Sequence, residues 1–283
     1  MKRLLVFPLL FFLFVAVTLF AAEVVQKEPE VTDLRQAFIS GTLVVRGDGA
    51  AQESGEMTEA QKKILALRSA KIVALRDAVE MINGIRVSGE TTVVNAASQS
   101  DIIHTAVRGL IRGAQVIKET YDPVSGAAVV FVSVPLTGPH SITGQILPQM
   151  GPILPQKNME YRPESAATVS GGYDGLIVDC RDVSFKPALV NRIVAKDGAV
   201  IYDPSRLPKN VLVEKGAAGY TDGVGKARAL LAAMGSKNPL EVKAAGVINS
   251  TDAEVAPEDA SSIFSSNQDN NYLQAARVIF VLR

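Results

Sequence analysis

The stretch LRSAKIVALRDAVEMINGIRVSGETTV, residues 67 to 93, decides the fold of the N-terminal half of this chain. Thr58 with Gln61 three residues later has the spacing of a capping box, and neither Gly nor Pro interrupts the chain from there until Gly84. This pattern predicts a helix of about 25 residues, roughly 37 Å long. Residues 85–93 then alternate between apolar and polar side chains, which predicts a half-buried strand.

One face of the predicted helix is apolar. At 100° per residue from Ile64, six residues fall within one arc: Leu67, Ala74, Leu75, Ala78, Val79 and Ile82. This arc favours a helix that builds a core over one that lies on a membrane. Arg68 and Lys71 intrude on the arc near its start, and two readings stay open. Either their charged ends extend past the edge of the sheet, or this end of the helix contacts a partner protein.

The remaining elements complete a first domain over residues 37–136. Residues 37–47 have strand composition, and a second helix is expected from Ser98 or Ser100 to about Leu110. The segments QVIKETY and AAVVFVSV are expected to be strands joined by the turn residues 122–126, with the second strand central because both of its faces are apolar. The predicted order is β-α-β-α-β-β, with two helices packed on one face of the sheet.

The C-terminal part of the chain predicts a second α+β domain. Six of the 14 prolines lie between residues 135 and 172, so residues 137–172 are interpreted as a Pro-rich linker with one short helix near residues 142–147. Residues 173–283 contain a strand in YDGLIVDC, a hairpin turning at Asp197-Gly198, a helix over 222–235, a strand in PLEVKAAGVI, a helix after Pro257 and a final strand. The fold class expected is α+β, with two small domains.

The first 22 residues have the layout of a secretory signal: a basic start, an apolar run and small residues at its end. Because the run is long enough to cross a bilayer, an uncleaved anchor is the alternative, and membrane association through this segment follows from it. Without Lys2 and Arg3 the chain has two fewer cations than anions, which argues against nucleic acid as a partner. The single cysteine, Cys180, lies far from the signal, so no cysteine is placed to carry a lipid anchor, and a small buried thiol is expected.

Candidate catalytic and metal sites are weak. His104 is expected on the polar side of its helix, and His140 lies in the Pro-rich segment. The loop YTDGVGKA (220–227) lacks the first glycine and the final Ser or Thr of a phosphate-binding loop. Asp174, Asp179 and Asp182 fit turn and strand-end capping better than a calcium site. We therefore predict no catalytic residue, cofactor or metal site.

Residues 61–136 carry a resemblance to known families. The matching features are the Ala/Arg-rich helix, the Asn-Gly-Ile-Arg-Val junction at 83–87, Ile-Arg-Gly-Ala at 111–114 and the strand VVFVSVPL. They resemble the Lpp-twenty lipoprotein family and the N-terminal domain of flagellar assembly protein T. The resemblance implies a bacterial cell-envelope protein without known catalysis, although those lipoproteins carry an acylated cysteine that this chain lacks.

The sequence thus predicts a non-enzymatic, exported protein, periplasmic or associated with the outer or inner membrane. It is expected to serve as an assembly or scaffold component with other envelope proteins as partners, and flagellar assembly is one setting. Arg68 and Lys71 are the residues that could contact a partner. The alternative is a periplasmic module whose C-terminal domain binds a small ligand or a cell-wall fragment.

Overall fold

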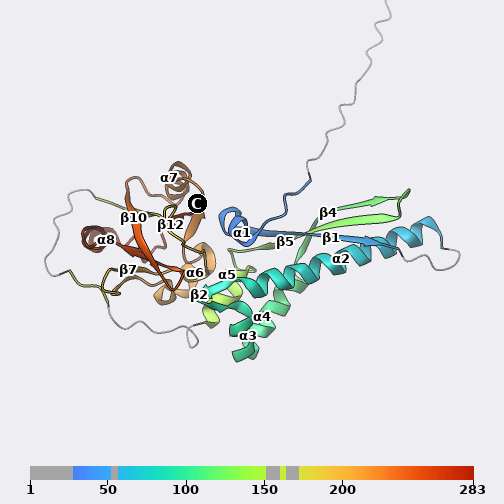
Figure 1. Ribbon diagram of the computed structural model, residues 1–283, viewed down its shortest axis with the longest axis horizontal. Coiled ribbons are helices and arrows are strands. Elements are labelled where there is room, and N and C mark those ends of the chain that lie inside the picture. The colour runs from blue at the N-terminus through green and yellow to red at the C-terminus, as the bar shows by residue number, and fades with distance from the viewer. Residues whose placement is uncertain (1–27, 52–56, 151–159, 164–171) are drawn as a thin grey trace, which may run out of the picture.

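The computed structural model describes residues 28–51, 57–150, 160–163 and 172–283. The chain is an α+β protein, as predicted, and its arrangement is consistent with two domains (Figure 1). The signal or anchor predicted over residues 1–22 lies outside the described residues. Within the described ranges, no helix is both long enough and apolar enough to span a bilayer.

The first domain is an elongated arm in which one long helix lies across a three-stranded antiparallel sheet (Figure 1). Strand β5 (Ala127–Pro135) lies between β1 (Thr42–Ala50) and β4 (Gln115–Asp122). The β4–β5 hairpin and the central place of β5 were both predicted and are confirmed. Helix α2 (Glu59–Gly84) has 26 residues and begins with the predicted capping box of Thr58. It packs on β1 and β5.

The buried side of α2 is mostly a row of small side chains, whereas the predicted arc also held Leu67, Leu75 and Val79. Its five buried residues are Ala66, Ala70, Ala74, Ala78 and Ile82. Leu67, Leu75 and Val79, predicted to point inward, are only half-buried, and Ile64 is exposed. The prediction is therefore confirmed for Ala74, Ala78 and Ile82, three of the six residues on the predicted arc.

Two glycines in β1 explain this difference. A Cβ added to Gly47 would lie 2.9 Å from the Cα of Ala74, and one added to Gly49 would lie 2.9 Å from the Cα of Ala70. The strand and helix backbones approach so closely here that neither side has room for a larger residue. Leu67 and Leu75 pack half-buried at the side of this contact, whereas Ile64, Leu65 and Ile72 are turned to solvent.

The single strand predicted over residues 85–93 is wrong. The chain forms a short hairpin of β2 (Arg86–Ser88) and β3 (Thr91–Thr92), which turns at Gly89 with φ +58°, a conformation that favours glycine. This hairpin is a separate two-stranded sheet. The predicted β-α-β-α-β-β sheet is therefore corrected to three strands, with α2 lying across one face.

Two short helices in the first domain were not predicted. Helix α1 (Leu34–Ser40) occupies the start of the strand expected over 37–47, because Asp33 forms a capping box at its N-terminus and Gly41 ends it at φ +73°. The second predicted helix is present as α4 (Asp101–Arg112), with Ser100 as its N-cap, and is confirmed, whereas the short helix α3 (Val93–Gln99) before it was not predicted. Both pack against α2.

The first part of the predicted linker belongs to the core. The short helix expected there is present as α5 (Ile142–Ile146), followed by the 3-10 turn η1 (Leu147–Gln149). Four of the apolar side chains in this stretch are buried: Ile142, Ile146, Leu147 and Met150. Residues 151–159 and 164–171 of the predicted linker lie outside the described residues.

The second domain is a seven-stranded mixed sheet in the order β8-β7-β11-β10-β6-β12-β9. Its strands are β6 (Gly175–Asp179), β7 (Ile193–Ala195), β8 (Val200–Tyr202), β9 (Gly219–Thr221), β10 (Pro239–Ile248), β11 (Asp252–Val255) and β12 (Val278–Val281). The helical segments are η2 (Pro204–Arg206), α6 (Lys209–Lys215), α7 (Val224–Ala233) and α8 (Pro257–Asn270). Strands β6, β7, β8, β10 and β12 and helices α7 and α8 were predicted, whereas α6, β9 and β11 were not.

The two domains share one hydrophobic core and are joined by main-chain hydrogen bonds. The amide of Leu189 donates to the carbonyl of Arg86 at 2.9 Å, and the amide of Val190 donates to the carbonyl of Val87 at 2.8 Å. A segment of the second domain therefore pairs with the β2 hairpin of the first. This pairing holds the arm in one orientation relative to the second domain.

A buried ion pair lies at the same junction. Arg192 Nε is 2.9 Å from an Asp203 carboxylate oxygen, and both side chains are almost fully buried. Burial alone would raise the pKa of Asp203. Hydrogen bonds from Ser205 and Arg192 outweigh that effect, and the pKa lies below its ordinary value.

Candidate protein-binding surface

The outward side of the N-terminal half of α2 is the strongest candidate site. Arg68 and Lys71 both lie there and are exposed, so the structure places both residues that the sequence singled out on a solvent-facing surface. Within the described part of the chain, neither of them forms an ion pair. Their guanidinium and ammonium groups are therefore available to a partner.

Three aliphatic side chains surround these two cations. Ile64 is 64% exposed, Ile72 is 51% exposed and Leu65 is 43% exposed. The spacing of these five residues places them within about a third of the helix circumference. We call Ile64, Leu65, Arg68, Lys71 and Ile72 the α2 outer face.

The α2 outer face follows from how the helix packs. Because the side facing the sheet has room only for alanine, Ile64, Leu65 and Ile72 point to solvent. Surface aliphatic residues are common singly, but three clustered around two unpaired cations are typical of a surface that another molecule covers. A helix face of this kind binds through its apolar side chains, while the charges set orientation and choice of partner.

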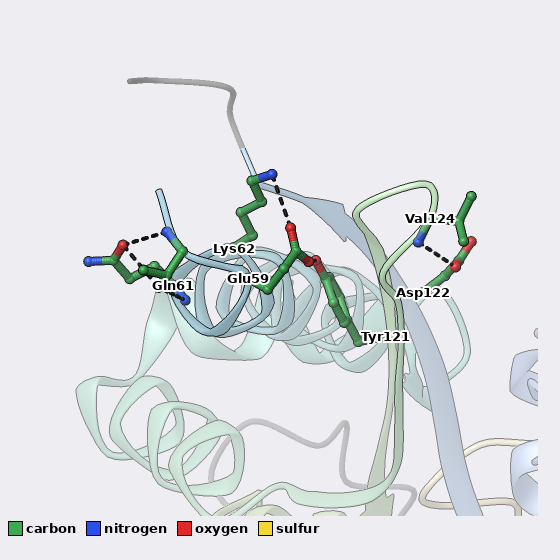
Figure 2. Close-up of polar contacts among 7 residues, drawn as sticks. Glu59, Gln61, Lys62, Tyr121, Asp122 and Val124 are labelled. Carbon is green, nitrogen blue, oxygen red and sulfur yellow. Dashed lines mark hydrogen bonds and ion pairs between the residues drawn. The ribbon is translucent and has the colours of Figure 1, made fainter. Parts of the chain in front are cut away.

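The tip of the arm keeps the start of α2 in place (Figure 2). The Tyr121 hydroxyl, on β4, donates to the Glu59 carboxylate at 3.3 Å, and Glu59 also pairs with Lys62 at 3.1 Å. Partial desolvation and the Glu59 charge raise the pKa of the Tyr121 phenol. These contacts link the first turn of the helix to the sheet, so the α2 outer face is presented on a fixed support.

The outer edge of β4 is a second exposed feature. It is an edge strand of the sheet, and Val116 and Ile117 on it are exposed. However, the ladder with β5 is interrupted by an irregularity between Val116 and Lys118, and the strand carries Lys118 and Glu119. Bulges and charges are the usual features that prevent edge pairing. The edge therefore suits a partner less well than the helix face does.

The other side chains considered from the sequence are not brought together. His104 and His140 are exposed and lie in different segments, α4 and the turn before α5. Cys180 is buried, as predicted. Lys226 pairs with Asp222 at 2.8 Å at the start of α7.

Two of the three aspartates of YDGLIVDCRD, Asp174 and Asp179, have structural partners, and Asp182 is exposed. Asp174 accepts hydrogen bonds from the Ser236 hydroxyl and from the amides of Lys237 and Asn238. Asp179 pairs with Arg181 at 2.7 Å. Among the described residues there is no group of three or more His, Cys, Asp or Glu side chains able to hold a metal ion.

A family model described as the second domain of Treponema pallidum Tp0624 matches residues 175–283. The match begins at the first residue of β6 and covers the second domain, less than half of the chain. No curated protein matches the sequence. The second domain is therefore similar to that Tp0624 domain.

Proposed function

We propose that this protein is an exported, non-enzymatic component of the bacterial cell envelope that acts in assembly or as a scaffold. In this proposal it is periplasmic or associated with the outer or inner membrane, and it contacts other envelope proteins through the α2 outer face. The observation that carries the proposal is the cluster of three exposed aliphatic residues around Arg68 and Lys71.

Two further features support a role in protein contacts. The arm is tied to the second domain by main-chain hydrogen bonds and a buried ion pair, so its outer face is presented without an ordering cost on binding. The resemblance of residues 61–136 to the Lpp-twenty family and to the N-terminal domain of flagellar assembly protein T favours an envelope setting, and the signal-like residues 1–22 favour export.

The proposal is tested by photocrosslinking in the native cell. A photoreactive phenylalanine analogue replaces Ile72 on the α2 outer face, and the matched control carries it at Glu80, exposed on the same helix outside that face. We expect the Ile72 position to give specific adducts with envelope proteins, and the adducts to be lost when R68E and K71E are added. Adducts with flagellar basal-body proteins would identify the flagellar setting. Equal, unspecific labelling from both positions would reject the α2 outer face as the contact surface.

A second candidate function, binding of a small ligand, is favoured by one observation. A pocket opens at the junction of the two domains, where it is lined by residues of both. It differs from the alternative predicted from the sequence, because it is not a site of the C-terminal domain alone.

A further inference from the structure

The junction pocket has a volume of about 250 Å³. Its walls come from the end of α1, the chain after β5, the segment between α6 and β9, and one side of α7. The main apolar side chains that line it are Phe38, Leu136, Leu189, Leu230, Met234 and Ile279. Most of these are buried, but Leu230 is exposed at 42% and lies at the mouth.

The pocket carries one charge. Among the described residues that line it, Lys215 is the one that is charged at neutral pH, and none is a carboxylate. Lys215 is the last residue of α6 and is exposed, and it forms no ion pair within the described part of the chain. The remaining polar contributions come from hydroxyl groups, such as those of Ser40 and Thr137.

We propose that the junction pocket binds a fatty acid, with its acyl chain in the apolar interior and its carboxylate at Lys215. The charge argument excludes a cationic amphiphile, because nothing in the lining would neutralise it. A neutral occupant would gain nothing from the Lys215 ammonium group, which water solvates, so an anionic head group is the one that this lining favours. This inference is independent of the α2 outer face, which lies on the arm.

The volume of the junction pocket limits the length of the acyl chain that it can hold. A dry cavity of about 150 Å³ holds benzene with its six carbon atoms, so 250 Å³ corresponds to roughly ten carbons. Affinity is therefore expected to rise by about fourfold for each methylene up to that length. Longer acyl chains should gain little more, because the additional methylenes would remain in solvent.

The test is calorimetric titration of the full chain, with each probe below its micellar concentration. Decanoate is expected to bind saturably at one site and octanoate about sixteenfold more weakly, because two methylenes are lost. Decanol, decyl phosphate and decyltrimethylammonium have the same chain length and different head groups. We expect decanoate to bind most tightly and the cation not to bind. Decyl phosphate binding tenfold more tightly than decanoate would overturn the assignment to a fatty acid.

Two substitutions locate the site. Lys215→Glu should lower the affinity for decanoate by about tenfold and leave the affinity for decanol unchanged. Lys209→Glu, the same change at the other end of α6, should alter neither affinity. Leu230→Glu places a carboxylate at the mouth and should abolish decanoate binding. Ala232→Glu, exposed on the opposite side of α7, is its control. The proposal fails if decanoate does not saturate, if Lys215→Glu weakens decanol as much as decanoate, or if Leu230→Glu binds decanoate like the unmodified protein.

Discussion

Arg192 donates a hydrogen bond to Ser88 across the domain junction, with 3.1 Å between Nη1 and the hydroxyl oxygen. Arg192 belongs to the second domain and Ser88 to the β2 hairpin of the first. Through Nε the same guanidinium holds the buried Asp203 carboxylate. The junction therefore contains a charge pair whose geometry involves both domains, and its loss should affect the whole molecule.

Removing Asp203 should destabilise the protein strongly. In D203A, the buried Arg192 would lose the Asp203 carboxylate, and we expect the free energy of unfolding to fall by about 3–5 kcal/mol in a denaturant titration. The exposed Asp182 provides a control, because D182A should change stability by less than about 0.5 kcal/mol. A loss below about 1 kcal/mol in D203A would show that Arg192 has sufficient other partners.

The same pair predicts an acid dependence. The pKa of Asp203 is lowered in the folded state, so its stabilising effect is present above its unfolded pKa of about 3.9 and is lost as the pH falls through the folded value. The difference in unfolding free energy between the unmodified protein and D203N should be constant from pH 7 to about pH 5 and shrink below that. A difference that stays constant down to pH 2 would contradict this assignment.

Local signals predicted the elements whose termini carry specific chemistry. The capping box at Thr58, the turn residues before Ala127 and the proline that opens α8 each specify a boundary through contacts within a few residues. Where a boundary depends on the backbone conformation of a single residue, the alternation of apolar and polar side chains predicted the wrong element. Residues 85–93 alternate like one strand, but Gly89 at positive φ divides them into two.

The orientation of α2 could not be read from its own sequence. Large apolar residues were assigned to the buried side by periodicity, but Gly47 and Gly49, on a different segment, leave room only for alanine there. The presence of Arg68 and Lys71 on the predicted apolar arc was a sign that the N-terminal half of α2 does not bury its large apolar residues. The junction pocket gave no signal at all, because its walls come from segments far apart in the sequence.

Adding a side chain to Gly47 should separate α2 from the sheet. In G47A the new Cβ would meet the backbone of Ala74, which cannot move without displacing the helix. We expect the free energy of unfolding to fall by about 2 kcal/mol or more, measured by thermal or denaturant unfolding. G109A is the matched control: a Cβ there has no neighbour within 4 Å, and alanine is the better helix former. G109A should be neutral or stabilising, and equal losses in both variants would refute the close-packing argument.

Cys180 should be unreactive in the folded protein. Its side chain is buried, and burial together with the nearby Asp179 raises the pKa of the thiol, so little thiolate forms at neutral pH. A disulfide reagent should label it fully in denaturant and at least about a hundredfold more slowly in buffer. Rapid labelling under native conditions would mean that this strand end opens readily.

Reversing both charges of the α2 outer face should leave the fold intact. Arg68 and Lys71 are exposed and form no ion pair within the described residues, so R68E/K71E should change the free energy of unfolding by less than about 0.5 kcal/mol. A70D, on the same helix, is the contrasting variant, because it places an unpaired carboxylate in the row facing Gly49 and should unfold the arm. If R68E/K71E unfolds as A70D does, these cations are structural and a partner must bind elsewhere. If R68E/K71E is as stable as the unmodified protein while its crosslinks disappear, the loss of crosslinks is not due to unfolding, and the α2 outer face is the binding surface.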